Sequence, residues 1–380
     1  MNNLGFGCMR LPLKGADQTD FDYTELNAMV DAFLDAGFTY FDTSYVYHEG
    51  KSQEAVRKAL VERYPRESFH VATKFPTFLN IAEDQIDALF QSQLDDLGVE
   101  YFDYYLLHNM KTVLYDGVDG NGGIVKETHL FDHLKRWKEE GRARHIGFSF
   151  HSSAAVLDRI LTEHPEVDFV QIALNPIDWD SEFVQAAACY ETIRRHDKKV
   201  VIMEMAKGGG LSMLPREAQA LLEAQDPMNS MTSWSLRFSL QFEEVIAVLS
   251  GMSNLEQTND NIAVAKASKP LSDSEMTALW KAMRIYRESA PITPEDLQFY
   301  KGLTWNNVSV SAILQAYSIC QIQPNPGFSD DNNYFRNELA EHAHLDIHGT
   351  LPKQAVILPN GIDVTDKVEE AVNWLVKHSF

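Results

Sequence analysis

The sequence predicts an α/β protein whose main part is a (β/α)8 TIM barrel. Short apolar runs alternate eight times with segments of helical periodicity, as a barrel of parallel strands requires. No Gly-x-Gly-x-x-Gly follows the first run, which disfavours an open doubly wound sheet. The alternation stops after Pro270. We therefore expect a barrel over residues 1–268 and a smaller, mostly helical C-terminal domain over residues 271–380.

The first strand is predicted at residues 4–9, and a helix over residues 25–36 follows, because apolar residues recur at helical spacing and Gly37 stops the pattern. Further barrel helices are expected around residues 55–60, 86–94 and 130–137 and from about residue 255. The remaining strands are predicted at residues 39–41, 69–74, 102–107, 144–148, 169–173, 200–204 and 245–249. Residues 271–380 carry helical patterns with a break rich in Pro, Asn and Asp at residues 323–333.

Composition excludes several classes of protein. A net charge of -22 over 380 residues argues against a nucleic-acid partner or an anionic membrane surface, because both need clustered positive charge. No run of about 18–20 apolar residues is present, so we expect no membrane-spanning segment. The three cysteines, Cys8, Cys189 and Cys320, are too dispersed for a disulfide framework. We expect a cytoplasmic protein that is a monomer or a small homo-oligomer.

Polar side chains stand at the ends of three consecutive predicted strands. Asp42, Lys74 and His108 occupy these ends, and Tyr47 lies in the loop after Asp42. In a barrel of parallel strands the ends meet at one face, where such folds build active sites. Taken singly, each residue has a simpler role as a turn or cap residue, a solvated charge or a packing group. Their conjunction on consecutive strands favours a catalytic site.

The motifs around these residues resemble those of the aldo-keto reductases. The resemblance is carried by GFTYFDTSYVYHEG at residues 37–50, by ATK at residues 72–74 and by YYLLHN at residues 104–109. It covers residues 4 to about 265 and is closest to the branch that carries a C-terminal ferredoxin-like domain. It implies a catalytic tetrad formed by Tyr47, Asp42, Lys74 and His108.

Such a tetrad would reduce a carbonyl group by hydride transfer, with Tyr47 as the general acid or base. A tyrosine with an ordinary pKa near ~10 is a reluctant acid/base until a nearby cation favours its phenolate. Lys74 can supply that cation, Asp42 can hold the lysine by an ion pair, and His108 can hydrogen-bond the substrate oxygen. The resemblance thus implies an NADP-dependent oxidoreductase that reduces an aldehyde or ketone to an alcohol, or runs the reverse.

The second half of the barrel resembles the nicotinamide cofactor site of the same family. Ser149 and Gln171 match residues that contact the nicotinamide carboxamide, although Gln171 and Asn175 could instead cap strand ends. Glycines after the seventh strand let backbone amides approach a phosphate, and the segment after the eighth strand resembles an adenosine site. The implied cofactor residues are Ser149, Gln171, Asn175, Lys207, Gly208, Gly209, Leu211, Gly251, Ser253, Asn254, Gln257 and Asn261.

Several details of this cofactor site bear on its specificity. Lys207 could add positive charge beside the pyrophosphate, and Met205 stands where proline is usual in the family. Ser253 is expected at a helix start, and Gln257 and Asn261 are expected on one side of that helix, towards the adenine. The arginine that often grips the 2′-phosphate has no clear counterpart. We therefore expect NADP, as NADPH, to be preferred only modestly, with NAD as a second candidate.

Two departures from the family pattern affect the floor of the barrel and the C-terminal domain. The chain starts almost directly in its first strand, so the floor would be closed by something other than the usual hairpin. The stretch LPNGIDV at residues 358–364 looks like the tail of a ferredoxin motif, but the four ligand positions, 348, 351, 354 and 358, hold no cysteine. We expect no iron–sulfur cluster and no other metal. The domain is then either a ferredoxin-like relict or an unrelated helical cap.

The expected partner is a small-molecule carbonyl substrate. Its identity stays open, because the loop at residues 109–127 and the C-terminal segment carry no readable pattern. Two other functions remain as alternatives: an NADPH-binding barrel that acts as a redox sensor or scaffold with little turnover, and a barrel lyase or isomerase without a nicotinamide cofactor. The intact tetrad favours the reductase.

Overall fold

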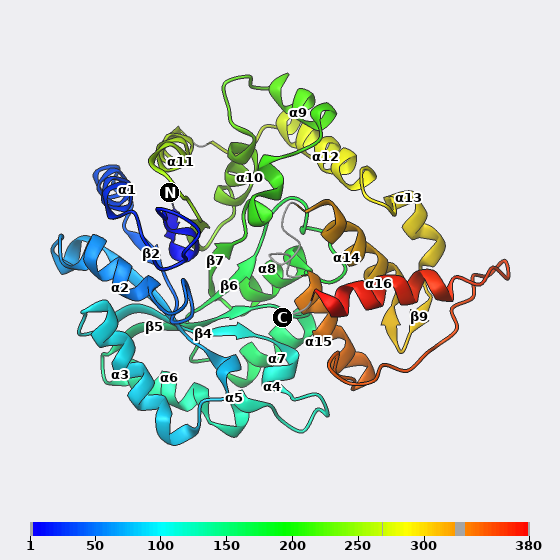
Figure 1. Cartoon of the computed structure of the whole chain (residues 1–380), viewed down its shortest axis with the longest axis horizontal. Coiled ribbons are helices and arrows are strands. Elements are labelled where there is room, and N and C mark those ends of the chain that lie inside the picture. The colour runs from blue at the N-terminus through cyan, green and yellow to red at the C-terminus, as the bar shows by residue number, and fades with distance from the viewer. Residues whose placement is uncertain (1–2, 268, 324–330, 379–380) are drawn as a thin grey trace.

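The computed structural model describes residues 3–267, 269–323 and 331–378. Eight parallel strands close into a barrel in which each strand pairs with its neighbour in sequence and β1 pairs with β8 (Figure 1). The predicted (β/α)8 barrel is therefore confirmed. The strands are β1 Leu4–Gly7, β2 Tyr40–Asp42, β3 His70–Phe75, β4 Phe102–Met110, β5 Ala143–Phe150, β6 Phe169–Ala173, β7 Lys199–Met203 and β8 Val245–Ser250.

Helices surround the barrel, and further helices continue beyond it (Figure 1). The barrel helices are α1 Tyr23–Asp35, α2 Ser52–Val56, α3 Ile86–Leu97, α4 Thr112–Tyr115, α5 Ile124–Glu127, α6 Leu130–Glu139, α7 Ala154–Glu163, α8 Ala186–Arg195, α9 Arg216–Glu223, α10 Met231–Leu240 and α11 Leu255–Ala267. The C-terminal region contains α12 Asp273–Glu288, α13 Pro294–Leu297, β9 Thr304–Trp305, β10 Val308–Ser309, α14 Val310–Ile322, α15 Asp331–Ala343 and α16 Thr365–Lys377. The extra region is thus mostly helical, with one short antiparallel hairpin.

Several strand boundaries differ by one to three residues from the sequence prediction, and those of β1 and β4 bear on the site. β1 ends at Gly7, and a 3-10 turn over Cys8–Arg10 replaces the predicted last residues of that strand. β4 runs on to Met110, so His108 lies within the strand and not directly after it. The pairing of β4 with β5 shifts register between Leu107 and Met110. An irregular ladder of this kind re-aims side chains next to a site, and hydrophobic pattern alone does not reveal it.

Local sequence explains where the helices around the site begin and end. The carboxylate of Asp22 accepts hydrogen bonds from the backbone N–H groups of Thr24 at 3.0 Å and Glu25 at 3.1 Å, and so caps α1. Gly98 ends α3 in the left-handed region at φ 69°, which a residue without Cβ adopts without strain. These signals fix the ends of the loops that connect the helices to the strands.

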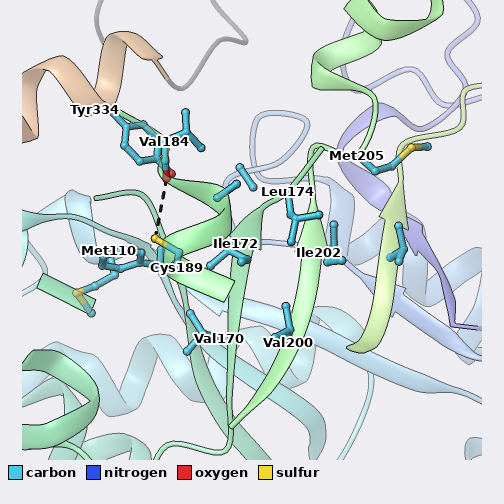
Figure 2. Packing of buried hydrophobic residues seen from close by; sticks show 14 of the residues in the cluster. Met110, Val170, Ile172, Leu174, Val184, Cys189, Val200, Ile202, Met205 and Tyr334 are labelled. Atoms are coloured by element: carbon cyan, nitrogen blue, oxygen red, sulfur yellow. Dashed lines mark hydrogen bonds between the residues drawn. The ribbon is translucent and has the colours of Figure 1, made fainter. Parts of the chain in front are cut away.

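Apolar side chains fill both the interior of the barrel and the layer between barrel and helices. The interior holds Tyr40, Ala72, Leu106, Phe169, Val201, Ala247 and Leu249. Figure 2 shows part of the outer layer, where Val170 and Ile172 of β6 lie near Cys189 of α8. The thiol of Cys189 donates to the carbonyl oxygen of Val184 at 3.9 Å, and Tyr334 of α15 lies beside them. Residues of the C-terminal region therefore share the outer core of the barrel.

The C-terminal region packs against loops that follow β5 and β6. The side-chain amide of Asn337 donates to the carbonyl oxygen of His151. The rings of Phe183 and Phe335 stack with centroids 6.3 Å apart. These contacts place α15 beside the end of the barrel at which the strands finish (Figure 1). The division into a barrel over residues 1–268 and a domain over residues 271–380 stays a prediction.

The opposite end of the barrel is partly hollow. A cavity of about 850 Å³ opens there and is lined by Asn3, Tyr104, His145, Lys199 and Val245 together with neighbouring residues. Lys269 and Pro270, which follow the last barrel helix, also line this cavity, and the way in which the floor is closed stays a prediction. None of the helices in the described ranges combines the length and apolar character that crossing a bilayer requires.

Candidate active site

The four residues of the predicted tetrad come together at the end of the barrel where the strands finish. Asp42 ends β2, Lys74 lies near the end of β3, and His108 lies near the end of β4. Tyr47 lies in the loop between β2 and α2, at the same end of the barrel, and is the fourth member of the group. Parallel pairing of β2 with β3 and of β3 with β4 brings the three strand residues to one face, as expected for a barrel of this type.

The ammonium group of Lys74 is the centre of this cluster. Its Nζ donates to Oδ1 of Asp42 at 2.5 Å, to the carbonyl oxygen of Thr43 at 2.7 Å and to the hydroxyl of Tyr47 at 3.4 Å. The side chains of Lys74 and Asp42 are 0% and 3% exposed. An ammonium has three donors and no acceptor, so all three of its protons have acceptors here. One of them is aimed at the Tyr47 hydroxyl.

His108 lies on the other side of Tyr47. Its Nδ1 is 3.0 Å from the hydroxyl oxygen of Ser44, which orients the imidazole. The rings of Tyr47 and His108 meet edge to face, with centroids 5.8 Å apart. Phe78 contacts the imidazole with a centroid distance of 5.6 Å and keeps 37% of its surface exposed. The imidazole of His108 therefore lies between the phenol of Tyr47 and the accessible, apolar ring of Phe78.

Electrostatics determine which protonation states this cluster holds. Burial acts to lower the pKa of Lys74, but the charges of Asp42 and Tyr47 outweigh burial and raise it. Lys74 is therefore a cation at neutral pH. Burial raises the pKa of Tyr47 above its ordinary value, and Lys74 only partly opposes this effect. The resting form of Tyr47 is therefore the neutral phenol, because desolvation of the phenol exceeds the influence of the cation.

The predicted nicotinamide contacts, Ser149 and Gln171, lie on neighbouring strands. The hydroxyl of Ser149 accepts a hydrogen bond from the backbone N–H of Asn109 at 2.8 Å. Nε2 of Gln171 contacts the sulfur of Met203 at 3.5 Å, whereas its Oε1 is buried and has no hydrogen-bond partner among the described residues. A buried amide oxygen without a donor costs free energy, and a ligand amide group would relieve that cost.

Asn175 has a structural role in the loop after β6. Its Oδ1 accepts from the backbone N–H groups of Ile177 at 3.1 Å and Asp178 at 2.9 Å. Its Nδ2 donates to the carbonyl oxygen of Glu204 at 3.0 Å. These bonds match the simpler reading of Asn175 as a strand-end cap. Its contact with a cofactor stays a prediction.

The loop after β7 contains the predicted phosphate-binding glycines. Gly208 and Gly209 adopt φ values of 65° and 98°, in the region that glycine reaches without strain. Lys207 donates to the two carboxylate oxygens of Asp178 at 2.9 and 2.8 Å, and both side chains are buried. Any positive charge that Lys207 offers to a phosphate is therefore largely offset by Asp178. Leu211 is 1% exposed and packs in the core.

The segment after β8 differs in detail from its predicted form. The helix begins at Leu255, as predicted, with Ser253 just before its first turn, and Oδ1 of Asn254 accepts from the backbone N–H of Gln257 at 2.9 Å. Oε1 of Gln257 in turn accepts from the N–H of Ser253 at 2.9 Å. Asn261 is 3% exposed and donates to the hydroxyl of Ser250 at 2.7 Å, so it faces inward while Gln257 is exposed. The spacing of four residues predicted that the two side chains lie on one side of the helix, but only Asn261 is buried.

Two residues that the sequence analysis did not single out lie at this end of the barrel. Arg10 follows β1, and a Cβ added at Gly251 would stand 3.4 Å from its Nη1. Burial lowers the pKa of Arg10, while Glu204 and Tyr47 oppose the shift. The signal for Arg10 was its place directly after a strand. Oε1 of Glu25 accepts from the N–H of Leu255 at 2.6 Å, a contact between α1 and α11 that the sequence does not reveal.

Three of the four positions that correspond to the ligands of a ferredoxin motif have other contacts in the structure. Oε1 of Gln354 accepts a hydrogen bond from the backbone N–H of Asn306, and Leu351 and Leu358 pack against the hydrophobic core. The three cysteines, Cys8, Cys189 and Cys320, are all buried. The absence of an iron–sulfur cluster stays a prediction, as does the relation of this region to ferredoxins.

The barrel and the polar cluster at its carboxyl end define the class of (β/α)8 barrel enzymes. A sequence model described as Aldo/keto reductase family matches residues 3–284. The chain therefore belongs to the aldo/keto reductase family, a family of NAD(P)H-dependent oxidoreductases.

Individual relatives agree with this assignment. A protein named probable aldo-keto reductase 1 of Glycine max is 30% identical over 180 residues, which cover 45% of this chain and 47% of that protein. This chain thus matches about half the length of that relative. The uncharacterized oxidoreductase YqkF of Bacillus subtilis (strain 168) is 25% identical over 308 residues, 73% of this chain and 92% of that protein.

Solved structures show the same fold. The holo form of the aldo-keto reductase AKR11C1 from Bacillus halodurans aligns with a TM-score of 0.56 at 24% identity, over 74% of this chain and 91% of that one. An aldo/keto reductase from Klebsiella pneumoniae, solved in complex with NADP and acetate, aligns with a TM-score of 0.57 at 18% identity, over 75% of this chain and 91% of that one.

Proposed function

We propose that this protein interconverts an aldehyde or ketone and the corresponding alcohol, with NADP(H) as hydride carrier and Tyr47 as general acid or base. The observation that carries the proposal is the position of the Lys74 ammonium, which contacts Asp42 and the Tyr47 hydroxyl together. An ion-paired lysine that directs a proton at a phenol has no use in packing, and both Lys74 and Asp42 are buried. A phenol can transfer its proton more readily when a fixed cation stabilises the phenolate that forms, and this arrangement supplies such a cation.

Proton transfer in the proposed reduction starts from neutral Tyr47. Because burial raises the pKa of Tyr47, the phenol keeps its proton at neutral pH and can donate it to the carbonyl oxygen. Lys74 then stabilises the phenolate that forms, and Asp42 keeps Lys74 in place. His108 lies beside Tyr47 and would donate a second hydrogen bond to the same oxygen. In the oxidation of an alcohol the same groups act in reverse.

The cofactor is assigned to the half of the barrel formed by β5 to β8. Bound NADPH supplies the hydride that reduces the carbonyl carbon. Gln171 would bond the nicotinamide carboxamide through its buried and unpartnered Oε1, with Ser149 on the adjacent strand. Gly208 and Gly209 would present backbone N–H groups to the pyrophosphate. NADP is favoured by a solved relative that holds NADP, and NAD remains the second candidate.

The proposed substrate carries an apolar group next to its carbonyl. Phe78 is 37% exposed, and its ring contacts the imidazole of His108. If the carbonyl oxygen of the substrate lies between Tyr47 and His108, the substituent on the carbonyl carbon would lie along the Phe78 ring. Burying an apolar substituent there gains about 25 cal/mol per Å² removed from water. Aldehydes with aryl or alkyl groups should therefore react better than small hydrophilic ones.

Turnover separates this proposal from a redox sensor or scaffold. Oxidation of NADPH, followed by its absorbance, is measured with 4-nitrobenzaldehyde as a generic substrate. A reductase consumes NADPH in a substrate-dependent manner at about 1 s⁻¹ or faster, the lower end of ordinary enzyme rates. A scaffold would bind NADPH, as a fluorescence titration reports, yet oxidise it negligibly. A lyase or isomerase would not bind NADPH.

The remaining expectations about the protein stay predictions. These are its cytoplasmic location, its state as a monomer or small homo-oligomer, the lack of a nucleic-acid partner and the relation of its C-terminal region to ferredoxins.

A further inference from the structure

Four polar side chains form a hydrogen-bond network between the barrel and its helices, behind Lys74. They are Gln53 of α2, Thr73 of β3, Gln93 of α3 and Tyr105 of β4, and each is at most 1% exposed. Oε1 of Gln53 accepts from the hydroxyl of Thr73 at 2.7 Å and from Nε2 of Gln93 at 3.1 Å. Oε1 of Gln93 accepts from the hydroxyl of Tyr105 at 2.5 Å. The network joins two helices to two strands.

Gln93 connects this network directly to Lys74. Its Nε2 also donates to the backbone carbonyl oxygen of Lys74 at 3.0 Å. Side chains alternate between the two faces of a strand, so Thr73 faces the network while Lys74 faces the barrel interior. Gln93 and Thr73 therefore hold the backbone from which the Lys74 side chain extends.

Gln53 connects the network to the loop that carries Tyr47. It lies in the first turn of α2, directly after Ser52. The hydroxyl of Ser52 lies 2.8 Å from the hydroxyl of Thr43 and donates to the carbonyl oxygen of Cys8 at 3.2 Å. The two ends of the loop are thus tied together at Thr43 and Ser52. The bond between Gln53 and Gln93 links that loop to the Lys74 strand.

We infer that Gln53 and Gln93 are positioning residues that hold the Tyr47 hydroxyl in register with the Lys74 ammonium. The inference rests on the proposed function. The separation between the Tyr47 hydroxyl and Lys74 Nζ is 3.4 Å, beyond the usual 2.7–3.2 Å of an N–H···O bond, so a small further shift would break the contact. Apolar side chains would fill the same space without needing partners, whereas a polar network must be satisfied at every member. Compared with apolar packing, the network adds a fixed orientation of the groups that it joins.

The variant Gln93→Met tests the inference, because methionine keeps the length of the side chain and removes its hydrogen bonds. We expect kcat for carbonyl reduction to fall about 10- to 100-fold, as displacements of about 1 Å in reacting groups do. The substrate KM and the NADPH Kd should change less than about twofold, since neither ligand meets Gln93. In alcohol oxidation the pH at which the rate rises should move upward, because Tyr47 loses stabilisation of its phenolate by Lys74.

Two further variants separate positioning from stability. Thr192→Val on α8 is the matched control: Thr192 is 3% exposed and accepts a hydrogen bond from Arg195 at 3.0 Å. It should lower the urea midpoint and leave kcat and the pH profile unchanged. Tyr105→Phe removes a single donor to Gln93 and should shift kcat and the pH profile in the same direction by a smaller factor. If Gln93→Met does not fold, kcat and the pH profile of Tyr105→Phe decide whether the positioning role holds.

The outcomes distinguish failure of the inference from failure of the proposed function. If Tyr47→Phe is inactive while Gln93→Met and Tyr105→Phe keep kcat and the pH profile of the native protein, the positioning role is wrong and the proposed function stands. If Tyr47→Phe is as active as the native protein, the proposed function fails, and the inference fails with it. A loss of kcat in Thr192→Val equal to that in Gln93→Met would also overturn the inference, because lower stability alone would then explain both.

Discussion

Lys74 and Asp42 form an ion pair with 2.5 Å between Nζ and Oδ1, at a depth where neither side chain is more than 3% exposed. Such a pair offsets its desolvation only when the geometry is good and the remaining donors are satisfied. The donors of Lys74 meet the second condition, since Thr43 and Tyr47 accept its other protons, whereas Oδ2 of Asp42 is buried without a hydrogen-bond partner among the described residues. The pair therefore serves to fix a cation beside a phenol, a task for which an apolar pair of equal volume would be useless.

Asp42→Asn should be strongly destabilising. The change leaves the Lys74 ammonium buried without its counter-charge, and removal of one partner of a buried pair typically costs about 3–5 kcal/mol. Urea unfolding of both proteins at neutral pH measures the difference in free energy of unfolding. A cost below about 1 kcal/mol would mean that the pair is solvated in solution and that the buried geometry does not persist.

Lys74→Met should move the pH dependence of the reaction upward. Lys74 acts to lower the pKa of Tyr47, so its loss raises that pKa further. Alcohol oxidation needs the phenolate, and its rate should therefore rise at a higher pH than in the native protein. Measuring kcat for oxidation between about pH 7 and 11 follows the shift. An unchanged pH profile would show that a group other than Tyr47 takes the proton.

Much of the barrel was predictable because each strand and helix carries its own periodicity and end signals. The end of β4 was not, because its irregular register near His108 depends on pairing with β5. The proximity of Asp42, Lys74 and His108 was predictable because parallel strands bring their ends together. The pairing of Lys207 with Asp178 and the contact of Glu25 with Leu255 were not, because they join residues far apart in sequence. Long-range side-chain partners leave no local pattern.

Acid should weaken the protein through His48. Nε2 of His48 accepts from the N–H of Leu11 at 3.1 Å, and its Nδ1 lies 3.0 Å from the carbonyl oxygen of Gln18, so the imidazole is neutral. Burial lowers its pKa. Because the folded pKa lies below the unfolded value of about 6.5, stability from His48 is complete above that pH and is lost as the pH falls through the folded pKa.

Urea midpoints of the native protein and of His48→Gln, measured from pH 8 to pH 5, test this expectation. The difference in urea midpoint between the two proteins should become smaller as the pH falls. Only the native protein contains the buried imidazole of His48, whose low pKa in the folded state makes acid destabilising. A gap that stays constant over the whole range would show that His48 does not titrate between those limits.

Glu25 should limit the preference for NADPH. Its carboxylate sits at the N-terminus of α11, where an anion would otherwise be favoured, and it opposes an extra phosphate near Ser253. We expect NADPH to bind better than NADH by at most about two decades in Kd, roughly 3 kcal/mol. Glu25→Gln should widen this preference several-fold, whereas Glu139→Gln on α6, an equal change of charge elsewhere, should not.

Fluorescence titration of both cofactors at two ionic strengths provides the comparison. Short hydrogen bonds change little with added salt, so the native ratio should be nearly constant. A native preference above a thousandfold would mean that a cation such as Arg10 reaches the 2′-phosphate and that Glu25 does not limit the preference.

The most direct test of the proposed mechanism is kcat for carbonyl reduction in Tyr47→Phe, measured together with its NADPH Kd. Phenylalanine keeps the ring against His108 and removes only the hydroxyl that Lys74 contacts. General acid catalysis contributes roughly 10²–10⁴-fold, so kcat should fall at least that far while the NADPH Kd stays within about twofold. A variant that keeps more than about a tenth of the native kcat would contradict the assignment of Tyr47 as the proton donor.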